Sequence, residues 1–265
     1  MAETSKSGPG RPEARNRLLI VKNSTNEGTG RLEALLRTHK IANDTVDLEA
    51  GDWFPDPRPY AGVVVFGGPD SANDRTVKIM HERARVRETI TNNIPYLGVC
   101  LGMQILAKVS GGRVYRAPNP EIGWYPMELT REGAKDPLFR GVNPPLNVLQ
   151  VHRETVRTHG TMKVLAIGSP CAIQAVTIGE TAYGIQGNLH LDNRMFDCWT
   201  GEDKDLRQLS RSQLVDQYNS LKERYEFNAD MILTNFLRIA GLVGSVGGAG
   251  GEGSLVQRSL DFVPV

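Results

Sequence analysis

The sequence has few cysteines, no long apolar run and almost no net charge. Three cysteines among 265 residues, an odd and small number, do not form a disulfide framework. Every apolar run is shorter than the roughly 20 residues that cross a bilayer, and the first residues lack the apolar core of a signal peptide. A net charge of +1 gives no general preference for nucleic acid or an anionic membrane. These absences predict a cytoplasmic protein that binds neither.

The composition changes at both ends of the chain. Residues 1–15 are rich in Gly, Pro, Ser and charge, which predicts a disordered N-terminal segment. Residues 241–265 begin with a Gly-rich stretch that is typical of a flexible tail. Between them, residues 16–240 contain enough apolar residues for a sizeable core, since 40% of the chain is apolar. We therefore expect one folded domain over residues 16–240.

Short apolar runs alternate with helical patterns in the first half of the chain. Residues 18–21 and 63–66 read as buried strands, a helix is expected over 30–39, and a further strand ends at Cys100. This alternation predicts a parallel sheet with right-handed crossovers. The segment from about 112 to 187 reads as more antiparallel and β-rich. Two helices are expected after it, one containing Leu214, Tyr218, Leu221 and Tyr225 on one face, and one over about 229–240.

Residues 94–104 contain a cysteine between two glycines, Gly98-Val99-Cys100-Leu101-Gly102. An apolar run precedes Cys100 and a helix-forming run follows it, which indicates a strand that turns sharply into a helix at this cysteine. Glycine fits such a corner because it has no Cβ to clash with neighbouring backbone. A helix N-terminus lowers a thiol pKa and favours the nucleophilic thiolate. The alternative is a buried structural cysteine, but burial alone gives no reason for Gly98 and Gly102.

A cysteine nucleophile needs hydrogen-bond donors for the oxyanion and a base held by a third group. The strand over 63–66 ends in a glycine turn, so the backbone N–H groups of Gly68 and Leu101 are the expected oxyanion donors. Among five histidines, His190 is the candidate base, because it follows a late strand and Asp192 lies two residues further on. We therefore predict a triad of Cys100, His190 and Asp192.

These motifs together resemble the class I, triad-type glutamine amidotransferases. The resemblance implies a flavodoxin-like open α/β sheet, mostly parallel, with helices on both faces and a smaller antiparallel β portion. It also implies that Gln104 contacts a glutamine substrate, that His152, Arg153 and Glu154 border its pocket, and that no metal or organic cofactor is required. The segments that carry the resemblance are 66–69, 98–104, 111–112, 121–124, 152–155, 171–175 and 183–186.

One position departs from the family pattern. The catalytic histidine is expected two residues beyond Gln186, where this chain has Asn188, and the His-x-Asp pair follows two residues later. A shift of two residues keeps strand parity but moves a side chain about 6–7 Å along an ideal strand. A bulge or bend at Gly187 would absorb this length. Either the rebuilt segment forms a working triad, or the site is degenerate.

Three functions are consistent with the resemblance. The first is glutamine amidotransfer, in which ammonia passes to a partner synthetase. The second is hydrolysis of a γ-glutamyl peptide, because residues 194–199 are similar to a stand-alone branch whose relatives include γ-glutamyl peptidases. The third is a non-catalytic regulatory or scaffolding protein on the same fold. The phosphate-binding Gly-x-x-x-x-Gly-Lys-(Ser/Thr) loop is absent, and no synthetase domain is expected in this chain.

Overall fold

A mixed β-sheet of nine strands forms the centre of the protein. The computed structural model describes residues 15–244, so residues 1–14 of the predicted disordered segment and residues 245–265 of the predicted tail lie outside the described range. The helix before the tail ends at Ile239, and Leu242 and Val243 still pack against the core. Within the described range no helix combines the length and apolarity that a membrane span requires.

The parallel part of the sheet carries the first strands of the chain. Its order is β2-β1-β3-β4-β9, and each neighbouring pair is parallel. The apolar runs that predicted β1 and β3 are buried on both faces, as expected for parallel strands covered by helices. The bounds are β1 Arg17–Lys22, β2 Ala42–Asp47, β3 Gly62–Val65, β4 Tyr96–Val99 and β9 Ala182–Ile185.

The sheet continues from β9 through the antiparallel order β8-β7-β5-β6. The α/β class is confirmed, and the flavodoxin-like form stays a prediction. The expectation of a mostly parallel sheet with a smaller antiparallel portion is wrong, because four neighbouring pairs are parallel and four are antiparallel. β5 has 17 residues and β6 has 12, whereas β3, β4 and β9 have four each. The long β5–β6 pair bends at a register shift between Arg116 and Glu121, so the sheet curls at this end. The bounds are β5 Arg113–Leu129, β6 Leu146–Arg157, β7 Met162–Ile167 and β8 Ile173–Ile178.

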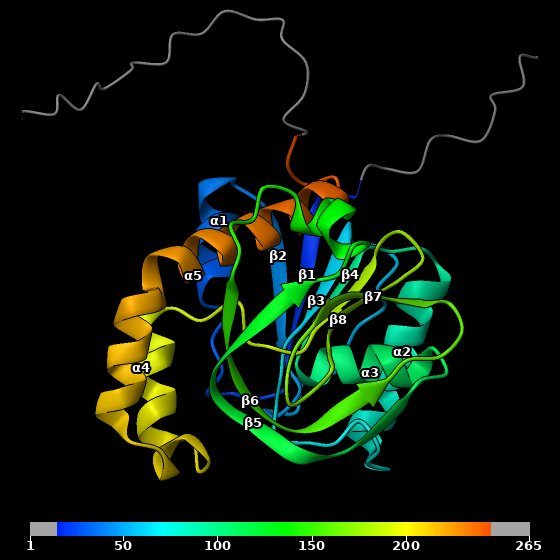
Figure 1. The fold of residues 1–265 in the computed structure, drawn as a ribbon. Helices are drawn as coiled ribbons and strands as arrows, with labels where there is room; N and C mark the ends of the chain where they lie inside the picture. Colours follow the sequence, from blue (N-terminus) through cyan, green and yellow to red (C-terminus); the bar gives the residue numbers. More distant parts are fainter. Residues whose placement is uncertain (1–14, 245–265) are drawn as a thin grey trace, which may run out of the picture.

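Helices cover both faces of the parallel strands (Figure 1). Side chains at Leu18 and Ile20 of β1 pack toward α1 and α5, and those at Leu19 and Val21 pack toward α2 and α3. This alternation explains why residues 18–21 of β1 are all apolar. The bounds are α1 Arg31–Thr38, α2 Val77–Thr91, α3 Leu101–Val109, α4 Asn193–Glu202 and α5 Arg211–Ile239, with 3-10 turns at Gly133–Lys135, Pro137–Phe139 and Leu206–Gln208.

The helix α5 differs from the prediction of two helices, because it is one continuous element of 29 residues. Its second half packs on the sheet, and its first half extends beyond the sheet beside α4 (Figure 1). There Tyr218 stacks on Trp124 of β5 and on Phe196 of α4. This aromatic cluster holds α4, and therefore the segment between β9 and α4, against β5 and β6.

Candidate active site

Cys100 occupies the predicted corner between β4 and α3. It is the N-cap residue of α3 and has φ 52° and ψ −107°, a conformation that non-glycine residues rarely adopt. A Cβ on Gly98 would lie 2.4 Å from the carbonyl carbon of Gly102, and one on Gly102 would lie 2.3 Å from the oxygen of Val65. Both glycines are therefore required by close backbone contacts, and the sequence-based prediction of the elbow is confirmed.

A cavity of about 410 Å³ opens over this corner. The residues that line it include Cys100 and both predicted oxyanion donors, Gly68 and Leu101. The N–H of Leu101 faces the sulfur of Cys100, where it favours the thiolate. A Cβ on Gly68 would lie 2.5 Å from the Cβ of Asn23, so the turn after β3 approaches the loop after β1 closely. The structure thus brings the thiol and the two residues predicted to supply oxyanion donors to one cavity.

The four predicted substrate-binding residues line the same cavity. Gln104 donates to the backbone oxygen of Glu154 over 3.1 Å, so the elbow helix is tied to β6. Arg153 is held by Asp205, with Nε and Nη2 at 3.0 and 2.6 Å from its two carboxylate oxygens. The hydroxyl of Ser71 donates to the Glu154 carboxylate over 2.7 Å. These contacts fix a polar wall opposite Cys100.

His152 belongs to a buried polar network behind this wall. Its Nε2 lies 2.9 Å from Oε2 of Glu121, which also accepts from Gln174 over 2.9 Å. The other carboxylate oxygen of Glu121 accepts from the N–H of Cys171 over 3.2 Å. Glu121, His152 and Cys171 place possible metal ligands within 4.8 Å of one another. Hydrogen bonds from protein groups already satisfy the Glu121 carboxylate, so a structural role explains the network without a metal.

The chain leaves β9 in a bend at Gln186–Gly187, the position where the sequence predicted one. A Cβ on Gly187 would lie 2.3 Å from Cγ2 of Val148, which explains the glycine by close approach. Asn188 then donates its backbone N–H to Leu149 over 2.9 Å. The segment after the bend is not a strand, so His190 lies in a loop that precedes α4.

His190 is fully buried in this loop. Its ring stacks on Phe66 with centroids 4.1 Å apart, and neither ring nitrogen has a hydrogen-bond partner among residues 15–244. Burial lowers the pKa of His190 to about 3, because the charged imidazolium loses its hydration. The base predicted from the sequence is therefore neutral and shielded from solvent.

The predicted pair of His190 and Asp192 is not formed. Asp192 is the N-cap of α4, and its Oδ1 accepts from the N–H of Met195 over 2.8 Å. The carboxylate that lies within 4 Å of the imidazole, among the described residues, is Glu27, whose Oε1 is 3.7 Å from Nε2 of His190. The prediction was wrong because the chain turns into a helix directly after His190, and a capping aspartate folds back onto that helix.

Sequence reasoning missed Glu27 and Gln186. Glu27 follows β1 and is buried in the cavity wall, and Gln186 places its Nε2 3.8 Å from the sulfur of Cys100. Burial raises the pKa of Glu27 to about 8, and burial followed by the Glu27 charge raises the pKa of Cys100 to about 12. A signal existed for Glu27, because loops at the carboxyl ends of neighbouring parallel strands meet at one sheet edge.

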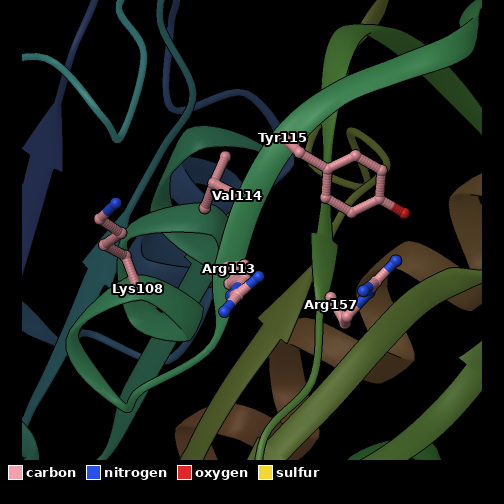
Figure 2. A pocket seen from close by; sticks show the side chains of 5 residues that line it. All are labelled: Lys108, Arg113, Val114, Tyr115 and Arg157. Carbon is pink, nitrogen blue, oxygen red and sulfur yellow. The ribbon is translucent and has the colours of Figure 1, made fainter.

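A second cavity lies at the opposite end of the elbow helix. It has a volume of about 480 Å³ and is lined by the basic side chains of Lys108, Arg113 and Arg157, together with Val114 and Tyr115 (Figure 2). Arg113 and Arg157 are directly opposite each other in the β5–β6 ladder. The guanidinium of Arg157 lies 5.8 Å from the ring centroid of Tyr115. This cavity shares no lining residue with the one over Cys100.

Fold and site together define an α/β protein with a cysteine on a strand-to-helix elbow. The family model described as glutamine amidotransferase class-I matches residues 32–187, more than half of the 265-residue chain. The chain therefore belongs to the class I glutamine amidotransferase family.

Individual relatives agree with the family. The chain is 31% identical over 137 residues to the glutamine amidotransferase-like protein YfeJ of Salmonella typhimurium, a match that covers 50% of this chain and 57% of YfeJ. It is 31% identical over 157 residues to a glutamine-hydrolyzing GMP synthase subunit of Sulfolobus acidocaldarius, covering 56% of this chain and 80% of that protein.

Solved structures extend the agreement to most of the chain. A glutamine amidotransferase of Thermotoga maritima superposes with a TM-score of 0.77 at 25% identity, over 86% of this chain and 99% of that one. A glutamine amido transferase of Methylobacillus flagellatus gives a TM-score of 0.77 at 21% identity, over 89% of this chain and 100% of that one, which shows the shared fold.

Proposed function

We propose that this protein hydrolyses the γ-amide of glutamine or of a γ-glutamyl compound, with Cys100 as nucleophile. The observation that carries the proposal is the elbow, where a cysteine at positive φ caps α3 beside the N–H of Leu101 and faces a cavity. The strained backbone is a cost that a merely buried cysteine does not explain. Membership of a glutamine amidotransferase family supports a glutamine amide as substrate.

The proposed reaction proceeds through a thioester. Cys100 transfers its proton to His190, and the thiolate attacks the γ-carbonyl carbon of the substrate. The N–H groups of Gly68 and Leu101 stabilise the oxyanion of the tetrahedral intermediate. His190 returns the proton to the departing ammonia or amine, which leaves the γ-glutamyl group on the sulfur. Water, deprotonated by His190, then cleaves the thioester and releases glutamate and the free thiol.

Mass spectrometry of the protein quenched after a pulse of glutamine or glutathione conjugate tests this proposal. A γ-glutamyl adduct is expected on the peptide that contains Cys100, and the Cys100→Ser variant should lose both the adduct and the glutamate release. The matched control is Cys198→Ser, because Cys198 is also a free cysteine and lines the same cavity, but it lies on α4 and not at the elbow. An active Cys100→Ser variant would contradict the mechanism.

The fate of the leaving group separates two forms of this activity. The relatives named as glutamine-hydrolyzing GMP synthase subunits support a small-molecule substrate and a partner synthetase that accepts ammonia. In contrast, direct hydrolysis of a γ-glutamyl peptide needs no partner protein. Amidotransfer would be favoured if a candidate synthetase raises glutamate release from glutamine at least tenfold. The peptidase would be favoured if glutamate is released from glutathione conjugates at the same rate with and without the synthetase. The free thiols Cys100, Cys171 and Cys198 support a cytoplasmic location.

A non-catalytic regulatory or scaffolding role is the second candidate function. It is favoured by the buried imidazole of His190, which has no hydrogen-bond partner in the described part of the chain, and by the raised pKa of the Cys100 thiol. Alkylation by iodoacetamide distinguishes the two functions. A Cys100 that stays unreactive up to pH 9, together with no thioester, would support the scaffolding role.

A further inference from the structure

We infer that Glu27, rather than Asp192, is the carboxylate that stabilises the protonated form of His190. The inference rests on the proposed function, since it assigns a positioning residue to the proposed thiol reaction. Glu27 lies in the loop between β1 and α1, far in the sequence from the loop that carries His190. Among residues 15–244, its carboxylate is the acidic group within 4 Å of the imidazole, with Oε1 at 3.7 Å from Nε2.

Glu27 and Cys100 converge on the same glycine. A Cβ on Gly67 would lie 3.2 Å from the Cβ of Cys100 and 3.3 Å from Oε1 of Glu27, so the missing side chain leaves room for both groups. The charge of Glu27 acts on the thiol, since it is the second cause of the raised pKa of Cys100. Glu27 therefore lies close enough to influence both the imidazole and the nucleophile.

Backbone contacts attach the loop of Glu27 to the loop of His190. The N–H of Arg31, the first residue of α1, donates to the backbone oxygen of His190 over 2.9 Å. Gly30 has φ 49°, and a Cβ there would lie 2.0 Å from the same oxygen. The two loops are thus in direct contact. A side chain at position 30 would push them apart and separate Glu27 from His190.

Both groups are neutral in the resting site because both are buried. Burial holds a proton on Glu27, whose pKa is about 8, and keeps the His190 imidazole unprotonated, with a pKa of about 3. Lys22, which pairs with Asp47 at 3.3 Å, lowers the pKa of Glu27 to a smaller extent. When Glu27 loses its proton to solvent, its carboxylate can stabilise the imidazolium that forms as His190 takes the Cys100 proton.

The rate of Cys100 alkylation by iodoacetamide from pH 6 to 10 tests this inference in the full-length chain. The wild type should show a step near pH 8, the pKa of Glu27. Glu27→Gln should lose this step and react at least tenfold more slowly at pH 8.5, as His190→Asn should. Glu27→Asp should keep a weaker step. Glu33→Gln, which changes an exposed glutamate on α1, is the matched control and should behave as the wild type.

The sign of the Glu27→Gln effect decides the outcome. If Glu27 were only a nearby charge, its removal would lower the thiol pKa and speed alkylation, and that result would overturn the inference. Loss of the step in Asp192→Asn but not in Glu27→Gln would also overturn it. Thermal melts exclude misfolded variants, and Glu27→Asp replaces Glu27→Gln if the latter does not fold. Alkylation reports the coupling even if the wild type hydrolyses no amide, so failure of the proposed function remains distinguishable.

Discussion

The hydroxyl of Tyr225 is expected to hold the His190 loop in place. Tyr225 is 3% exposed and lies on α5. Its hydroxyl donates to the backbone oxygen of Asn188 over 2.9 Å and accepts from the N–H of Leu191 over 2.9 Å. One oxygen atom thus binds the backbone on both sides of His190. A Tyr225→Phe variant removes this atom and changes nothing else in the side chain.

The expected cost follows from two buried backbone groups that lose a partner. A buried donor or acceptor without a partner costs about 1–3 kcal/mol, so the loss of two partners should lower the unfolding free energy of the variant by about 2–6 kcal/mol. For a chain of this size each kcal/mol lowers Tm by about 2–4 °C. Amide hydrolysis should also fall, because the loop is no longer held and His190 can leave its position beside Glu27.

Urea unfolding and glutamine hydrolysis, measured on the same preparations, check this prediction. Tyr218→Phe is the matched control, because Tyr218 lies on the same helix and its hydroxyl makes one contact, at 2.7 Å from Oδ1 of Asn193. The control leaves its ring stacking intact and should cost less than about 1 kcal/mol. Equal destabilisation by the two variants would refute the reasoning.

Three further predictions concern single positions. The pKa of Glu27 in the folded state, about 8, exceeds its ordinary value of 4.5, so the stability of the wild type should fall as pH rises from 4.5 to 8. The Tm of Glu27→Gln should therefore exceed the Tm of the wild type at pH 9 but not at pH 4. Gly102→Ala should lower the free energy of unfolding, measured in urea, by about 1–3 kcal/mol or more, since its Cβ would lie 2.3 Å from a backbone oxygen. The control Gly201→Ala, which has open space around it, should raise the free energy of unfolding by about 0.5–1 kcal/mol. Arg157→Glu should raise stability by about 0.2–1 kcal/mol in low salt, because it faces Arg113 across the β5–β6 ladder; an unchanged Tm would show that the arginines do not repel each other.

The local features of the fold followed from residue patterns. Doubly buried strands require continuous apolar runs, and β1 and β3 have them; the elbow needs small residues on both sides of Cys100, and Gly98 and Gly102 are there. The proportion of parallel to antiparallel strands in the sheet did not follow from these patterns. β5 begins at Arg113, and its first half contains exposed charged residues, so no apolar period marked that half as a strand. Its pairing with β6 supplies the order that its own sequence does not.

By itself the sequence determined that a cysteine caps a helix beside backbone donors, because the elbow and the glycine turn depend on neighbours within a few residues. Only the tertiary structure decided which carboxylate reaches His190. Asp192 is adjacent in sequence, but the helix that starts there takes its carboxylate as a cap. Glu27 is distant in sequence and reaches the imidazole because β1, β3, β4 and β9 end at one edge of the sheet. Two side chains that are two residues apart face the same side only where the backbone stays extended, and after His190 the backbone turns into a helix.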